Sequence, residues 1–317
     1  ETVLKNVGRN NIKVDHYQAI AEELNSQGRP QHAEVIMPLP GETIKTHIDG
    51  LNKLLDTNVS KVMSHTLQVL HGTPYKDDEE YRRTHGYVTK YRIVPLDFSQ
   101  VDDKYIFDVE EVGVATNTFS FEEYVEARKY LLVIDLCYSS GIFEPLKKHL
   151  RSLGIKNATW IKAIYRQIDR LAPDLAEVFD SFVSETRSEL WDTEKELVNF
   201  YSSPENYEKL INYEMGGNVL FKHRVWILTK YSQQWIDSVF HDTERLVLAQ
   251  ATPANESAVR RELDSVKDFV LCSVVHSFSF EKLDEPIEKT FSYDIPAWLK
   301  TAGPVALGEY GVSETIP

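Results

Sequence analysis

The first third of the chain alternates short apolar runs with longer segments whose apolar residues recur at helical spacing. Residues 2–4, 33–39 and 62–70 have the composition of strands. The segments between them carry one apolar stripe each, formed by Val14, Tyr17, Ile20, Ala21 and Leu24 in the first and by Ile44, Ile48, Leu51 and Leu55 in the second. This order predicts parallel strands joined by crossover helices. In such folds chemistry gathers at the carboxyl ends of the strands, here residues 5–13, 37–43 and 69–77.

The rest of the chain becomes progressively more helical. A polar helix is expected at 75–85, strands or extended segments at 87–94 and 105–115, and a helix at 121–137 that opens with a capping box of Ser120 and Glu123. Further helices are expected at 145–153, 158–171, 174–200, 204–214, 220–240 and 256–278, followed by an extended segment at 287–295 and a short turn at 296–299. We therefore predict an α/β domain at 1–145 and a mainly helical domain at 146–317.

The segment from Met37 to Thr43 has the composition of a rigid strand-to-helix turn. Pro38 and Pro40 restrict the backbone, and Gly41 permits a close approach of another chain segment. Glu42 and Thr43 supply an acid and a cap at the start of the next helix. The pattern fits either a stiff loop without chemistry or one wall of a binding site.

Three candidate side chains stand in or beside the predicted strands. Glu34 lies within an apolar run, and a parallel strand buried on both faces would bury its carboxylate at high cost. It should therefore face a polar cavity or pair with a cation such as Arg9, unless the strand lies at a surface edge. His65 either faces a cavity or is a satisfied core histidine. The spacing of His65 and His71 fits no usual zinc pattern.

The loop after the first apolar run contains an arginine followed by two amides. Arg9, Asn10 and Asn11 could hold a carboxylate or ribose hydroxyls, and they could equally be ordinary turn residues. The tryptophans and tyrosines of the helical half are most simply explained as core residues.

Charge and cysteine content exclude several classes of protein. The formal charge of −14 argues against nucleic-acid binding, which needs clustered Lys and Arg. Cys137 and Cys272 are expected to be buried free thiols, since two isolated cysteines make neither a metal framework nor a disulfide scaffold. No apolar run reaches the roughly 18 residues of a membrane span. These features suit a cytoplasmic protein, and a chain that starts at Glu1 in patterned sequence is expected to be a fragment.

Four segments in order resemble one enzyme superfamily. They are "LKNVGRNNI", "AEVIMPLPGET", "VMSHTLQVLHGTP" and "VATNTFSFEEYVEARKY", which together cover residues 4–136. This set resembles the later barrel strands of radical S-adenosylmethionine (SAM) enzymes, in particular the subgroup with an amino-terminal cobalamin-binding domain. The resemblance implies the C-terminal part of a partial (β/α)6 TIM-like barrel, containing its fourth to sixth strands, followed by a mainly α-helical region.

The resemblance also implies cofactors and partners. The family cleaves SAM at a 4Fe-4S cluster to make a 5′-deoxyadenosyl radical that abstracts hydrogen from a small-molecule substrate, and cobalamin, where present, often relays a methyl group. An electron donor such as flavodoxin or ferredoxin reduces the cluster. The family's C-x-x-x-C-x-x-C motif is absent from this chain. The cluster ligands and the cobalamin domain are therefore expected outside it, and the fragment alone is expected to be inactive.

Carried over position by position, the resemblance assigns candidate cofactor-binding residues to three strands. They are Arg9 and Asn11 after the fourth strand, Glu34, Met37 and Pro38 on the fifth, and Leu67 and Gln68 on the sixth. His65 and Tyr75 are candidates for facing the substrate on geometry alone. Two alternatives remain: a non-catalytic helical interaction module on a degenerate barrel, and an unrelated complete barrel enzyme, which would need more strands than the sequence shows.

Overall fold

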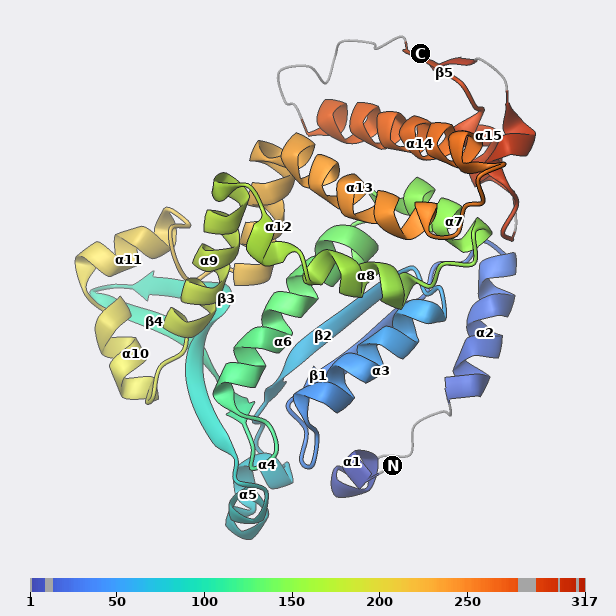
Figure 1. The fold of residues 1–317 in the computed structure, drawn as a ribbon. Coiled ribbons are helices and arrows are strands. Elements are labelled where there is room, and N and C mark those ends of the chain that lie inside the picture. Colours follow the sequence, from blue (N-terminus) through green and yellow to red (C-terminus); the bar gives the residue numbers. More distant parts are fainter. Residues whose placement is uncertain (1, 9–13, 279–288, 302, 312–313, 317) are drawn as a thin grey trace.

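A computed structural model describes residues 2–8, 14–278, 289–301, 303–311 and 314–316 of the chain. The fold is mixed α/β, as the sequence predicts, with a small sheet at one side and a large helical region packed against it (Figure 1).

The predicted strand–helix–strand unit is confirmed. Strand β1 (His32–Met37) leads through α3 (Ile44–Asp56) to β2 (Lys61–Gln68), and the two strands pair in parallel from His32↔Lys61 to Met37↔Thr66. Helix α3 lies against this pair (Figure 1). Its N-terminus is fixed by a capping box of Thr43 and Thr46, which satisfies backbone N–H groups that the helix itself leaves unpaired.

The predicted strand at residues 2–4 is wrong. These residues belong to the short helix α1 (Thr2–Asn6), and α2 (Val14–Ser26) follows in the chain. A three-residue apolar run carries too little periodicity to separate a strand from a helix. Tertiary contacts decide here: Asn6 Nδ2 donates to the Pro40 carbonyl at 2.9 Å, and the Tyr81 hydroxyl donates to the Asn6 carbonyl at 3.0 Å.

An antiparallel hairpin completes the sheet in the order β1-β2-β4-β3. Strand β3 (Val88–Val101) pairs along most of its length with β4 (Lys104–Ala115), whereas β4 meets β2 only at Leu67↔Gly113 and Gln68↔Val112. The sheet is therefore mixed and open in the described part of the chain. The expected single helix at 75–85 is two, α4 (Pro74–Asp77) and α5 (Glu79–His85), because Asp78 caps the second by accepting from Tyr81 N.

The helical region begins with α6 (Phe121–Ile134), which opens with the predicted capping box and continues into a π-helical turn, η1 (Asp135–Ser139). The other elements are, in chain order, α7 (Glu144–Ser152), α8 (Asn157–Tyr165), η2 (Ile168–Arg170), α9 (Pro173–Ser188), α10 (Glu194–Tyr201), α11 (Pro204–Ile211), α12 (Val219–Lys230), α13 (Ser232–Leu248), α14 (Glu256–Ser277), β5 (Lys289–Phe291), α15 (Ile295–Leu299), η3 (Leu307–Tyr310) and β6 (Glu314–Ile316).

Two long predicted helices are each split in the structure. The segment 174–200 breaks between α9 and α10, because Trp191 exchanges two backbone hydrogen bonds of 2.8 Å with Tyr91 of β3. The segment 220–240 breaks at Tyr231, between α12 and α13. The expected turn at 296–299 is helical, in α15. Of the extended segment 287–295, the described part contains β5, and residues 287 and 288 lie outside the described residues.

One hydrophobic core runs from the sheet into the helical region. It joins side chains of α3 and β2 to those of α6, α8, α13 and α14, with Trp160 and Trp235 fully buried. This core crosses position 145, and the division into 1–145 and 146–317 stays a sequence-based prediction. Cys137 is a buried free thiol, as expected, and burial raises the pKa of its thiol well above the ordinary value. Cys272 is also free but only half-buried.

His149 on α7 is a fully buried ionisable ring in the helical region. Its side chain is 0% exposed, and neither ring nitrogen has a hydrogen-bond partner among the described residues. The nearest carboxylate oxygen, on Glu262, lies 3.8 Å from His149 Nδ1. Burial lowers the pKa of His149 to about 4.

We expect His149 to make the fold acid-sensitive. Because its pKa is lower in the folded state than the ordinary value of about 6.5, the unfolded chain binds a proton first, and stability falls as pH falls from about 6.5 towards 4. Between pH 7 and pH 5 this group alone should remove about 2 kcal/mol of unfolding free energy. Urea unfolding at the two pH values should show a smaller loss for His149→Phe, whereas the exposed His71→Gln should leave the loss unchanged.

Candidate functional site

The turn after β1 is locked by a chain of buried polar contacts. A cis peptide bond joins Met37 to Pro38, and Gly41 has a φ of 81°, where an added Cβ would lie 2.9 Å from Asn6 Nδ2. The buried Glu42 carboxylate accepts from Leu39 N at 3.0 Å and contacts His47 Nδ1 at 2.9 Å. His47 Nε2 lies 3.3 Å from the Ser64 hydroxyl on β2. These contacts explain why the turn after β1 is rigid.

The face of β1–β2 that points away from α3 carries the pair Glu34 and His65. Their side chains are 58% and 53% exposed, and Glu34 Oε2 lies 3.4 Å from His65 Nε2 across the two strands. Alternate residues point the other way, since Ser64 contacts His47 and the Thr66 hydroxyl lies 3.0 Å from the Tyr124 hydroxyl. The premise that Glu34 stands on a strand buried on both faces is therefore wrong. Glu34 pairs with a histidine on an open face.

The other sequence-predicted site residues are dispersed. Met37 and Pro38 are buried, and the Met37 side chain packs with Val112, Phe119 and Tyr124. Leu67 is buried beside Gly113, and Gln68 Nε2 donates to Glu110 Oε2 at 2.5 Å. The Tyr75 ring packs edge-on against Tyr81 and Tyr87. Arg9 and Asn11 lie outside the described residues. The structure thus brings the side chains of Glu34 and His65 into contact, but it does not gather all of the predicted site residues in one place.

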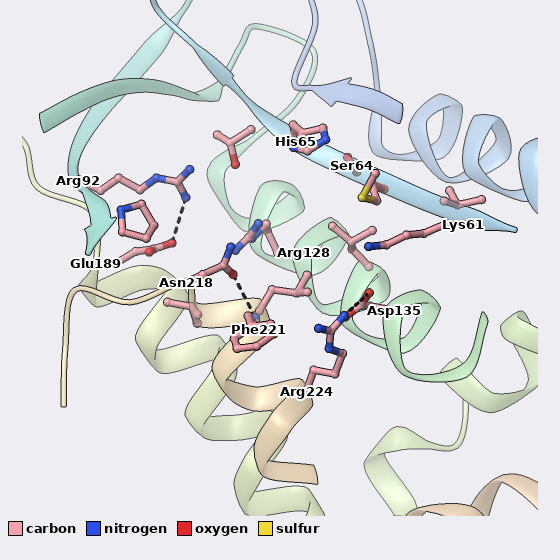
Figure 2. Close-up of a pocket in the computed structure, with 17 residues that line it drawn as sticks. Lys61, Ser64, His65, Arg92, Arg128, Asp135, Glu189, Asn218, Phe221 and Arg224 are labelled. Atoms are coloured by element: carbon pink, nitrogen blue, oxygen red, sulfur yellow. Dashed lines mark hydrogen bonds and ion pairs between the residues drawn. The ribbon is translucent and has the colours of Figure 1, made fainter. Parts of the chain in front are cut away.

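A cleft of about 290 Å³ lies beside β2, on the side away from β1 (Figure 2). Its walls come from β2, β3, α6, η1, the segment after α9 and the start of α12. The residues that line it are Lys61, Val62, Met63, Ser64, His65, Thr66, Arg92, Pro95, Arg128, Leu131, Asp135, Glu189, Asn218, Val219, Leu220, Phe221 and Arg224.

The cleft exists because β4 leaves β2 after two residue pairs. At the other end of β2, Ser139 takes the place of a strand: its hydroxyl accepts from Val62 N at 3.2 Å and donates to Val62 O at 3.0 Å. Helix α6 runs between these two points, and Arg128, Leu131 and Asp135 lie along the side that borders the cleft. Helix α6 therefore lies where a neighbouring strand would otherwise pair with β2. The gap between this helix and the edge of β2 is the cleft.

Four cationic side chains and two carboxylates line this gap, and most are paired. Arg92 Nε lies 2.6 Å from Glu110 Oε1, and Arg92 Nη1 lies 3.4 Å from Glu189 Oε1. Arg224 Nη1 lies 3.1 Å from Asp135 Oδ2. Burial raises the pKa of both Glu189 and Asp135, and the neighbouring arginines offset part of that rise. The arginine partners therefore favour the ionised form of both carboxylates, against the effect of burial.

The sequence pattern pointed to His65 but to none of the Lys, Arg, Asp and Glu residues that line this cleft. One local signal existed, because Arg128 and Asp135 stand on the same helical stripe as the buried Tyr124 and Leu131. Charged side chains at such positions are almost never fully buried without a role or a partner. Arg92, Glu189 and Arg224 gave no such signal, since their meeting depends on long-range packing.

The described residues contain no group of three or more His, Cys, Asp or Glu side chains arranged to hold a metal ion. None of the described helices combines the length and the apolar character that a membrane crossing requires.

The Arg92–Glu189 pair should be essential to stability. In Arg92→Met the half-buried Glu189 carboxylate, whose side chain is 18% exposed, loses its ion-pair partner, and we expect a loss of about 3 kcal/mol in unfolding free energy. Adding Glu189→Gln to Arg92→Met should recover much of that loss in urea unfolding. Arg187→Met breaks the more exposed pair with Glu122 and should cost under about 1 kcal/mol. Equal losses for the two single variants would contradict this account.

No protein-family model matches the chain, and a search of the curated proteins finds no match. The function is therefore argued from the open β1–β2 face, the cleft and the sequence motifs.

Proposed function

We propose that the chain is the C-terminal part of a radical SAM enzyme whose β1–β2 unit forms one side of a partial (β/α)6 barrel. The observation that carries the proposal is the exposed Glu34–His65 pair on one face of a parallel strand pair. Parallel strands are nearly always covered on both faces. A polar, uncovered face with two hydrogen-bonding side chains suits a wall that faces a bound polar cofactor.

The free edge of β1 supports the same interpretation. In the described part of the chain β1 is the terminal strand of its sheet, with β2 as its partner. Further parallel strands of a barrel would pair with that edge and bring their own carboxyl ends beside those of β1 and β2. The ordered segments "AEVIMPLPGET" and "VMSHTLQVLHGTP" coincide with β1, β2 and the loops that follow them.

Within this proposal the candidate residues take different roles. Glu34 and His65 would offer side chains to SAM and substrate, and Gln68 stands at the end of β2 beside Glu110. Met37, Pro38 and Leu67 are buried, so their contribution would come from the backbone. Arg9 and Asn11, which precede β1 in the chain, stay in the proposal as SAM contacts. Tyr75 stays in it as a substrate contact.

The two cysteines do not fit a 4Fe-4S cluster. Cys137 is buried with a raised thiol pKa, and Cys272 stands on α14 in the helical region, far along the chain. A cluster of this family needs three exposed thiolates close together, so in this proposal its ligands belong to a part of the protein outside this chain. The bound cluster would supply the electron that cleaves SAM to a 5′-deoxyadenosyl radical. Cobalamin-dependent methyl transfer is one outcome the resemblance allows.

The test uses the full-length protein, reconstituted anaerobically with iron and sulfide and reduced by dithionite or flavodoxin. We expect 5′-deoxyadenosine from SAM, and we expect Glu34→Gln to weaken SAM binding by roughly tenfold through loss of a charge-assisted hydrogen bond. The control is Lys53→Gln, an exposed change on α3. A protein without iron–sulfur absorbance or SAM cleavage would contradict the proposal and favour a non-catalytic helical interaction module.

A further inference from the structure

We propose that the cleft between the free edge of β2 and helices α6 and α12 binds the phosphate group of a small phosphate monoester through Lys61, Arg128 and the N-terminus of α12. This site adjoins the open β1–β2 face, since Lys61 and His65 of β2 line it, but the inference does not depend on SAM chemistry. Figure 2 shows the side chains of Lys61, Arg128 and Arg224 reaching into the same region from β2, α6 and α12.

Arg128 is the observation that points to a ligand. Its side chain is 7% exposed and lines the cleft, and its Nε has no hydrogen-bond partner in the described structure. Among the described residues it makes no ion pair of the close kind that Arg92 and Arg224 make. Burying an unpaired guanidinium is costly, and folded proteins normally pair such a group or use it to bind an anion.

The carboxylates near Arg128 are already engaged. Glu189 is 3.4 Å from Arg92, and Asp135 is 3.1 Å from Arg224. Lys61 enters the cleft from β2, and its side-chain ammonium makes no close ion pair or hydrogen bond within the described residues. Arg128 and Lys61 thus act on Glu189 and Asp135 only at longer range, and neither cation has a close ion pair among the described residues of a chain whose formal charge is −14. Together they match the charge of a phosphate monoester near neutral pH.

The start of α12 adds backbone donors to these cations. Residues 218–221 line the cleft, and the Asn218 side chain accepts from Phe221 N at 3.0 Å to begin the helix. The first turn of a helix leaves N–H groups without partners inside the helix, and its dipole favours an anion there. The helix end, the guanidinium and the ammonium thus offer the mixture of donors by which phosphate is commonly held.

The rest of the lining indicates a small organic body on the phosphate. The cleft volume of about 290 Å³ exceeds the space of a bare phosphate ion. Its remaining surface includes Leu131, Val219, Leu220 and Phe221, which are apolar. A ligand with a phosphate at the cationic end and a compact apolar part would fill both regions.

Phosphate binding can be measured on the 317-residue chain by calorimetry and phosphorus NMR at low ionic strength. The probes are inorganic phosphate, phenyl phosphate and benzoate, which separate the phosphate from the apolar body and from a simple carboxylate. We expect phenyl phosphate to bind more tightly than inorganic phosphate, and benzoate to bind most weakly. Benzoate binding as tight as phenyl phosphate binding would overturn the phosphate assignment, and no binding of any probe at millimolar concentration would overturn the site.

Variants distinguish a binding role from a structural one. Arg128→Met and Lys61→Met should each raise the Kd for phenyl phosphate by roughly tenfold or more. The matched control is Arg83→Met, an exposed arginine of α5, which should bind like the unchanged chain. Arg128→Met should also keep or raise the melting temperature of the ligand-free chain, since it removes a buried charge that has no close ion pair. A lower melting temperature with unchanged Kd would show that Arg128 serves the fold alone.

Discussion

The unpaired edge of β2 is the constraint around which the rest of this structure is arranged. A strand that pairs with β1 on one side still presents N–H and C=O groups on the other, and buried backbone groups need partners. Here β4 provides them at Leu67 and Gln68, and Ser139 provides both for Val62. Between these points no described strand pairs with β2. The cleft is the space that this arrangement leaves.

Helix α6 connects this edge to the helical region. Tyr124 bonds with Thr66 of β2, and Tyr130 donates to Asn52 of α3 at 2.8 Å, so the helix is fixed against the sheet layer by polar contacts inside an apolar core. Arg128 of this helix and Asp135 of η1, which continues it, line the cleft. Arg224 of α12 pairs with Asp135 of η1, and Arg92 of β3 pairs with Glu189 after α9. These ion pairs join walls of the cleft that come from different elements. Charge pairing and packing therefore hold the cleft open together.

The parts that the sequence predicted are those with strong local signals. The strand–helix–strand unit and the capping box of Ser120 and Glu123 are encoded within single segments, and the structure confirms them. The strand expected at residues 2–4 and the unbroken helix at 174–200 failed because long-range contacts, at Asn6 and Trp191, outweighed local preference. For the site, the sequence singled out Glu34 and His65 but not their contact, and it missed the cationic cleft, whose members come from five elements.

The central claim is that β2 has an open edge beside the cleft, and one measurement tests it directly. Lys61 N donates to the carbonyl of Gln31, the residue before β1, whereas Val62 N donates to the Ser139 hydroxyl on the opposite side of β2. Because successive amides of a strand point to opposite sides, the Ser64 amide points towards the cleft, and the amides of Met63 and His65 point towards β1. Residue-resolved amide hydrogen exchange should therefore show Ser64 exchanging faster than both neighbours. Equal protection at the three amides would mean that the edge is paired, and would contradict the account.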